Sequence, residues 1–382
     1  MKKLCILHFQ PVEKYPPAFN FTRVLAATGI QKVEIHLITT DPGNGKQKIQ
    51  IPDVHIHRVA KWQSGMSRTS RMKLYVRFVV FALLRLLKEK PSALLYYETG
   101  SAGAPYFYNI WLNPSCRLFI HYHEYTSPEE YASGMIFHRW LHRLENSLYK
   151  KANWVSHTNK DRMKLFDQDL GVDTPKHTYI LPNHPPAAWT SSIVKTDDQI
   201  TADRIGFVYV GALSIETMYV KQMAEYIAAR PAECFWDIYS DNHTTEAVEF
   251  LEKKRATNIS FKGAVNYDAL PGTLSNYQVG LVLYNGHIPN YIYNVPNKFY
   301  EYYVCGLDVW FPKEMVSCLG LVTRDTFPKV IPINFEKLDD VSFHKETERR
   351  NFKYHKQEYA CEKTYLPLVR LLINEPEELG AN

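Results

Sequence analysis

The chain has 382 residues, of which 45% are hydrophobic and 22% are charged, and its formal net charge is +5. These fractions are ordinary for a globular protein, so they exclude wholesale disorder and a body embedded in a membrane. The length suits two domains, and the positive charge forms no basic stripe interleaved with aromatic residues, so nucleic acid is not an expected partner.

The chain begins with lysines and a short apolar run that stops at Phe9, Gln10 and Pro11. The run is too short for a secretion signal and is better explained as a first β-strand. The six cysteines are scattered along the chain without the close spacing of a metal or redox motif. We therefore expect buried thiols in the reducing cytoplasm, and no metal site.

Strand-like and helical patterns alternate through the first half of the chain. The expected strands are 4–9, 33–39, 54–59, 93–97, 118–122, 154–157 and 179–181. The expected helices are 18–27, 72–88, 128–150 and 161–170. Strands that alternate with helices predict a parallel sheet covered by helices on both faces.

Residues 68–90 read RTSRMKLYVRFVVFALLRLLKEK, an apolar helical pattern flanked and interrupted by basic residues. The uninterrupted apolar run is too short to cross a bilayer. Such a helix either lies in the interface of a membrane or packs on the sheet while its basic side chains reach water. Both interpretations stay open at this point.

A polar connection follows, at 182–186 and 190–203, and the alternation then restarts. The further strands expected are 206–210, 235–239, 259–262, 279–283 and 307–311, and the further helices are 218–229, 245–254, 270–276, 296–304 and 354–372. The sequence therefore predicts an α/β fold of two facing Rossmann-like domains with a cleft between them. The expected domains are 1–185, with a returning helix at about 354–382, and 204–345.

The segment NVPNKFYEYYVCG, which starts at Asn294, has the features of a short helix between two strands. Asn294 is expected to cap the helix, Pro296 suits its first turn, and Gly306 suits its end. Lys298 and Glu301 share one face of this helix, since they are three positions apart. Such a pair could bind a nucleoside diphosphate, with Lys298 at the phosphates, or form an ordinary surface ion pair.

Residues 258–284 read NISFKGAVNYDALPGTLSNYQVGLVLY, and 294–310 read NVPNKFYEYYVCGLDVW. They give, in order, a strand with Gly, a short helix with Leu-Pro, a strand, Pro-x-Lys-x-x-Glu-Tyr, and Gly before another strand. This order resembles the donor-binding half of retaining GT-B glycosyltransferases of the family-4 type. The resemblance implies a nucleotide-sugar as the donor.

The resemblance also implies roles for single residues. Glu301 would hold the ribose, the backbone at Ala264 and Val265 would meet the nucleobase, and the strand ending at Gly211 would deliver that glycine to the diphosphate. The donor-binding positions expected on this basis are Gly211, Gly263, Ala264, Val265, Asn294, Pro296, Lys298 and Glu301.

In the first domain, residues 118–125 read LFIHYHEY and resemble the family's strand that ends in a histidine at the sugar pocket. We expect His123 to contact the transferred sugar, because His121 would face the same side of the sheet but lie deeper. A histidine with a purely structural role is the alternative. The expected catalytic residues are His123, Lys298 and Glu301.

Three positions depart from the family pattern. Tyr293 replaces the first of two glutamates, no Arg or Lys directly follows Gly211 unless Lys221 or Lys298 substitutes, and residues 10–17 replace a glycine-rich loop. These departures put one sugar contact and the acceptor side in question.

The expected activity is transfer of a hexosyl group, with retention, from a nucleotide-sugar to a glycan or lipid-linked acceptor in surface polysaccharide biosynthesis. No obligatory metal or other cofactor is expected, because positioned charges and helix dipoles can stabilise the leaving diphosphate. A peripheral membrane contact through 68–90 would suit a lipid-linked acceptor. The alternatives are a sugar-nucleotide epimerase on the same fold and a non-catalytic nucleotide-binding protein.

Overall fold

The computed structural model describes residues 2–29, 33–43, 48–61, 65–170, 178–191, 204–254, 256–341, 353–354 and 358–373. The chain forms two compact units, Met1–Asn183 with Cys361–Asn382, and His184–Ala360. Most of the polar connection expected at 190–203 lies outside the described residues. The interdomain cleft stays a prediction.

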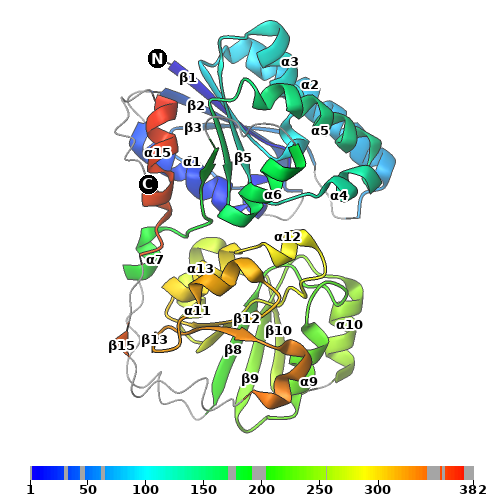
Figure 1. Ribbon diagram of the computed structural model, residues 1–382, viewed down its shortest axis with the longest axis vertical. Helices are drawn as coiled ribbons and strands as arrows, with labels where there is room; N and C mark the ends of the chain where they lie inside the picture. Colours follow the sequence, from blue (N-terminus) through cyan, green and yellow to red (C-terminus); the bar gives the residue numbers. More distant parts are fainter. Residues whose placement is uncertain are drawn as a thin grey trace. The chain divides into compact units, whose positions relative to one another are not determined.

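The first unit is built on a parallel sheet, as the alternation predicts (Figure 1). Its strand order is β3-β2-β1-β4-β5-β6-β7, the order of a Rossmann fold with one strand added. The strands are β1 (Lys2–His8), β2 (Val33–Asp41), β3 (Val54–Lys61), β4 (Ala93–Tyr97), β5 (Arg117–Tyr122), β6 (Trp154–His157) and β7 (Thr178–Ile180).

The helices of the first unit connect successive strands. They are α1 (Pro16–Gly29), α2 (Arg68–Glu89), α3 (Gly103–Phe107), α4 (Pro128–Ser133), α5 (Ile136–Tyr149) and α6 (Lys160–Leu170), with short turns η1 (Val12–Lys14), η2 (Thr99–Ser101) and η3 (Tyr108–Leu112). The single helix expected at 128–150 is wrong. Gly134 is extended, with ψ of −175°, and separates α4 from α5, in line with the low helix propensity of glycine.

The last helix, α15 (Cys361–Ile373), returns to the first unit and lies beside α1 (Figure 1). The Tyr365 ring packs edge-on against Phe21 at 5.4 Å. The Arg117 guanidinium donates to the carbonyls of Leu371 and Leu372 at 2.7 and 2.9 Å, which satisfies the end of the helix. The expected start near 354 is wrong, because Lys353–Tyr354 forms the short strand β15 instead.

The second unit repeats the same topology, with strand order β10-β9-β8-β11-β12-β14. The strands are β8 (Ile205–Val210), β9 (Cys234–Tyr239), β10 (Ile259–Gly263), β11 (Val279–Leu281), β12 (Asp308–Pro312), β14 (Val330–Ile333), and the separate pair β13 (Thr326–Phe327) and β15. The helices are α7 (Ala187–Ser191), α9 (Val220–Ala228), α10 (Thr245–Lys254), α11 (Leu270–Leu274), α12 (Pro289–Ile292) and α13 (Asn297–Val304), with turns η4 (Tyr267–Ala269), η5 (Val316–Leu321) and η6 (Phe335–Asp340).

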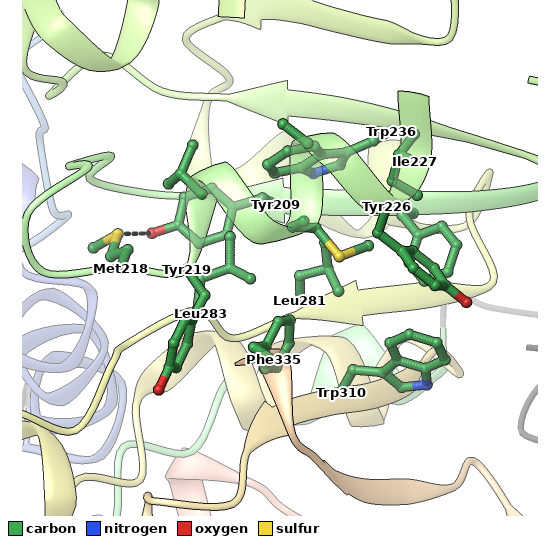
Figure 2. Packing of buried hydrophobic residues seen from close by; sticks show 14 of the residues in the cluster. Tyr209, Met218, Tyr219, Tyr226, Ile227, Trp236, Leu281, Leu283, Trp310 and Phe335 are labelled. Atoms are coloured by element: carbon green, nitrogen blue, oxygen red, sulfur yellow. Dashed lines mark hydrogen bonds between the residues drawn. The ribbon is translucent and has the colours of Figure 1, made fainter. Parts of the chain in front are cut away.

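Both faces of the second sheet are buried, and alternating residues of one strand enter different cores. Phe207 and Tyr209 lie in the core beneath α9 and η6, whereas Val208 lies in the core beneath α11 and α13. Figure 2 shows the first of these cores, to which Tyr209, Trp236 and Trp310 belong. Burial on both faces explains the near-continuous apolar strands of the sequence.

The six cysteines are free and buried, as expected. Among the described residues, no helix combines the length and apolar character needed to span a bilayer.

Helix α13 packs closely on the sheet because β11 presents a glycine to it. A Cβ atom built on Gly280 would lie 2.2 Å from the Tyr302 ring. Any side chain at this position would therefore push α13 away from the sheet.

We expect Gly280→Ala to destabilise the second unit by about 1–3 kcal/mol through overpacking. Gly272→Ala is a matched control, because a Cβ atom at this helical position would meet nothing within 4 Å. That change is expected to be neutral or to stabilise by up to about 1 kcal/mol. Denaturant unfolding followed by tryptophan fluorescence measures both, and equal midpoints would contradict this account of the packing.

Candidate functional site

The start of α13 is set by a proline. Pro296 is extended, with φ of −74° and ψ of 158°, and its carbonyl accepts the Phe299 N–H at 3.0 Å. The expected capping role of Asn294 is therefore wrong, and Pro296 holds the N-cap position. A residue before proline disfavours the helical conformation, and Val295 accordingly lies outside any helix. The Asn294 carbonyl instead accepts a hydrogen bond from the Cys318 thiol at 3.2 Å.

The end of α13 is formed by Gly306, as expected. Its φ of 73° is a left-handed conformation that favours glycine. The Leu307 N–H donates to the Tyr302 carbonyl and the Gly306 N–H to the Tyr303 carbonyl, both at 3.0 Å. These two bonds define a Schellman motif, which fixes the length of the helix and the direction of β12.

The amine of Lys298 is buried beside the end of β8. Only 8% of the residue is exposed, and Nζ donates to the Tyr209 hydroxyl at 3.0 Å. Nζ also lies 4.2 Å from the centroid of the Tyr209 ring and 5.3 Å from that of Tyr284, distances suited to cation–π attraction. The hydroxyl of Tyr209 donates in turn to the Ala212 carbonyl, and Figure 2 shows the same hydroxyl beside the Met218 sulfur.

Gly211 and Lys298 are brought together by this packing. A Cβ atom on Gly211 would lie 2.9 Å from Lys298 Nζ, and the φ of Gly211 is 126°. The conformation there favours glycine, and a Cβ atom would also crowd the amine of Lys298. The Tyr302 hydroxyl accepts the Val210 N–H at 2.9 Å, which fastens α13 to the end of β8.

Burial changes the protonation of both charged residues on α13. It lowers the pKa of Lys298 to about 7, with a smaller opposite effect from Glu301. It raises the pKa of Glu301 to about 7, while the charge of Lys298 and a hydrogen bond with Tyr267 act in the opposite direction. Both groups can therefore gain or lose a proton near neutral pH when a charged ligand arrives. The alternative of an ordinary surface ion pair is wrong, because both residues are buried.

The expected nucleobase positions lie at the carboxyl end of β10 and just after it, in the same sheet. Gly263 ends β10 with φ of 75°, Ala264 is exposed and Val265 is half-buried. Tyr267, which follows in the same loop, hydrogen-bonds Glu301. The structure thus connects this loop to α13 through Glu301. All these positions follow the carboxyl ends of parallel strands, where ligands bind in open α/β sheets.

The structure distinguishes the two lysines considered for the phosphate contact. Lys221 is exposed on α9, and its amine lies 6.0 Å from the Phe250 ring on α10. Lys298 is the lysine placed against Gly211.

In the first unit, His123 is held firmly just after β5. Its ring stacks on Tyr97 at 5.0 Å, and its carbonyl accepts a hydrogen bond from the buried Arg162 guanidinium. Its N–H donates to Glu98 Oε1 at 2.5 Å. Burial, with smaller effects from His121 and His8, lowers its pKa well below the usual value. His123 therefore has a neutral ring that is buried at the carboxyl edge of the first sheet.

Glu98 belongs to the same edge and was missed by the sequence interpretation. It follows β4 directly and accepts the N–H groups of His123 and, at 3.2 Å, of Glu124. The sequence offered one indication of its role, because Glu98 is an acidic residue immediately after an apolar strand. Its contacts depend on the pairing of β4 with β5, which the sequence pattern does not fix.

No family model matches the chain, and no curated protein matches its sequence. Solved structures do match it. HepE from Anabaena in complex with UDP and glucose has a TM-score of 0.67 and 12% identity over 98% of this chain and 100% of that chain. Sucrose-phosphate synthase from Thermosynechococcus elongatus has a TM-score of 0.61 and 14% identity over 98% and 95%.

UDP-GlcNAc 2-epimerase from Neisseria meningitidis, bound to UDP-GlcNAc, has a TM-score of 0.59 and 11% identity over 98% of this chain and 100% of that chain. Such low identities show the fold alone. The chain has the GT-B fold, made of two Rossmann-like domains with parallel sheets.

Proposed function

We propose that the chain is a glycosyltransferase that moves a hexosyl group from a nucleotide-sugar to a glycan or lipid-linked acceptor. The observation that carries the proposal is the buried amine of Lys298 beside Gly211, with Glu301 on the same short helix. Retention of configuration, the family-4 relationship and a role in cytoplasmic surface polysaccharide biosynthesis belong to the same proposal.

The second unit would bind the donor. An amine with a pKa of about 7 becomes fully charged when a diphosphate lies beside it, because the anion compensates the cost of burial. Glu301 would accept hydrogen bonds from the ribose hydroxyls, and the loop from Gly263 to Val265 would contact the base. Pro296 would shape the start of α13, and Asn294 would lie before it.

The transfer itself needs no group beyond those of donor, acceptor and protein. The bond between the sugar C1 and the diphosphate oxygen breaks, and its electron pair leaves with the diphosphate. A new bond forms between C1 and the acceptor oxygen, whose proton passes to a diphosphate oxygen. Lys298 would stabilise the leaving charge, and the neutral ring of His123 would contact the transferred sugar. An obligatory metal is not part of the proposal.

A sugar-nucleotide epimerase is a second candidate. It is favoured by the similarity to the Neisseria enzyme and by the titratable carboxyl of Glu98 at the edge of the first sheet. An epimerase changes the donor without any acceptor, so product analysis in the absence of acceptor separates the two. A third possibility, a non-catalytic binding protein, would bind nucleotide without converting its sugar.

We expect the titration of Lys298 to weaken the binding of UDP, ADP or GDP as pH rises through about 7. The reason is that Lys298, whose pKa is lowered to about 7 by burial, must gain a proton to meet the anion. Above that pH the fall approaches about tenfold per pH unit. Calorimetric titration of the nucleotide panel at several pH values measures it.

The variants Lys298→Met and Glu301→Ala are expected to weaken this binding at least about tenfold below pH 7. Lys298→Met should also remove the part of the pH dependence that Lys298 supplies. Lys221→Met is the matched control, because Lys221 is exposed and lies on α9. Equal losses in Lys221→Met and Lys298→Met, or no binding of any nucleotide by the wild-type protein, would count against the site.

Contact with an anionic membrane surface through α2 is also part of the proposal. The outer side of α2 exposes a stripe of apolar residues, Val76, Val80, Leu84 and Leu87, with Val80 at 52% and Leu84 at 61%. Lys73, Arg77 and Lys88 are exposed along the same helix, whose acidic residue, Glu89, is buried. An apolar stripe with basic neighbours suits a surface of anionic lipids.

The stripe has apolar neighbours on η3 and α5. Trp111 is 70% exposed and Ile136 is 74% exposed, and Leu112 and Trp140 are exposed as well. Tyr75 on α2 contacts Phe137 on α5 at 5.2 Å, and Phe137 contacts Trp140 at 5.5 Å. These contacts place the stripe and α5 on one side of the first unit. A lipid-linked acceptor would be reached from such a surface.

We expect the protein to float with vesicles that contain phosphatidylglycerol and not with pure phosphatidylcholine vesicles. The double variant Val80→Glu with Leu84→Glu should lose at least about tenfold in binding, because two charges must then enter the interface. Val316→Glu with Leu319→Glu is the matched control, since both residues are exposed apolar positions of the second unit. Equal flotation of both double variants would refute the contact.

A further inference from the structure

Glu98 adopts a backbone conformation that is normally restricted to glycine. Its φ is 60° and its ψ is 155°, a region that a side chain makes costly. Such strain persists only where surrounding contacts impose it, and it is found mostly at functional sites. Glu98 lies directly after β4, at the carboxyl edge of a parallel sheet, which is the edge that binds ligands in this class of fold.

Hydrogen bonds on both sides hold Glu98 in this conformation. Its N–H donates to the His121 carbonyl at 3.2 Å, and its carbonyl accepts the Ser101 N–H at 2.9 Å. Its carboxyl accepts the N–H groups of His123 and Glu124. Within the described part of the chain, both of these carboxyl bonds end on Oε1, and Glu98 is partly exposed. Oε2 is therefore the oxygen available to a ligand.

The surroundings of Glu98 suit a sugar. His123, whose backbone it holds, stacks on Tyr97 and lies 6.3 Å from the rings of both His8 and Tyr15. Flat rings bind the C–H faces of a sugar, and a carboxyl binds its hydroxyl groups. Of these rings only that of Tyr15 is partly exposed, so a reachable aromatic ring and a carboxyl oxygen occur together at this edge of the first sheet.

The proton of Glu98 is exchangeable near neutral pH. Burial and the nearby charge of Glu124 raise its pKa to about 8, while the N–H groups of His123 and Glu124 and the charge of Arg162 act in the opposite direction. The carboxyl can therefore accept a hydrogen bond from a hydroxyl group as a carboxylate, or donate one as an acid.

We propose that Glu98 is a substrate-binding residue of the first unit, whose Oε2 hydrogen-bonds a hydroxyl group of the transferred sugar. The inference rests on the proposed sugar transfer and adds to it a residue that the resemblance does not supply. The strain at Glu98 is then the cost of holding this carboxyl and the His123 backbone at one place.

Glu98→Gln tests this role, because its amide oxygen can keep the two backbone bonds while the titratable group is lost. The ligands are UDP-glucose, ADP-glucose and GDP-mannose, each compared with its free diphosphate by calorimetry. At pH 9, where Glu98 is a carboxylate that only accepts hydrogen bonds, we expect the variant to bind the diphosphate as the wild type does and to lose at least about tenfold in affinity for the corresponding sugar form. Its thermal midpoint should stay within about 4 °C of the wild type at neutral pH.

Two further variants separate binding from structure. Glu129→Gln removes an exposed carboxylate of the same unit and is expected to change neither affinity. Glu124→Gln should lower the pKa of Glu98, because the charge of Glu124 raises it. The part of the pH dependence that Glu98 supplies should then move to lower pH in Glu124→Gln and be absent in Glu98→Gln, while the part that Lys298 supplies remains in both.

The outcomes are distinct. Unchanged affinity of Glu98→Gln for the sugar form would overturn the role of Glu98 and leave the proposed function intact. Equal losses for diphosphate and sugar form, with a clearly lower thermal midpoint, would show a structural brace and overturn the role as well. A wild-type protein that binds none of the nucleotides would contradict the proposed function itself, and this role with it.

Discussion

The burial of a single amine is the constraint on which the site of the second unit depends. Lys298 is removed from water between Tyr209, Tyr284 and Gly211, and its position is fixed because Tyr302 fastens α13 to Val210. Removing a charge from water is unfavourable, so this amine lies near its protonation midpoint in the free protein. A surface lysine would attract phosphate equally at any ordinary pH. In the proposed site, the buried amine would couple binding of the anion to uptake of a proton.

Both units use the same feature of parallel sheets. The strands all end at one edge, so residues far apart in the sequence meet there without any special device. In the second unit the edge brings Gly211 to Lys298, and the loop after β10 to Glu301. In the first unit the edge brings Glu98 to His123. The close packing of α13 on Gly280 keeps Lys298 beside Gly211, because a larger residue at position 280 would displace the helix.

The sequence predicted most of the fold and part of the site, for identifiable reasons. Strands buried on both faces leave apolar runs, and Ala93–Tyr97 and Trp154–His157 were predicted to the residue. The strand Val330–Ile333 was missed, because it is short and contains Pro332, which only an edge strand tolerates. Lys298 is buried against Tyr209, and the conformation of Glu98 is held by a hydrogen bond to His121. Both contacts join residues far apart in the sequence, so no local sequence pattern predicts them.

The two units differ in what their edges can bind. Burial lowers the pKa of His8 to about 4 and that of His121 to about 3, and it lowers that of His123 well below its usual value. These rings are uncharged at neutral pH, so they can donate or accept hydrogen bonds but cannot compensate a diphosphate. The second unit has the amine that can. Under the proposed sugar transfer, the second unit would therefore bind the phosphates, and the first unit would bind neutral hydroxyl groups.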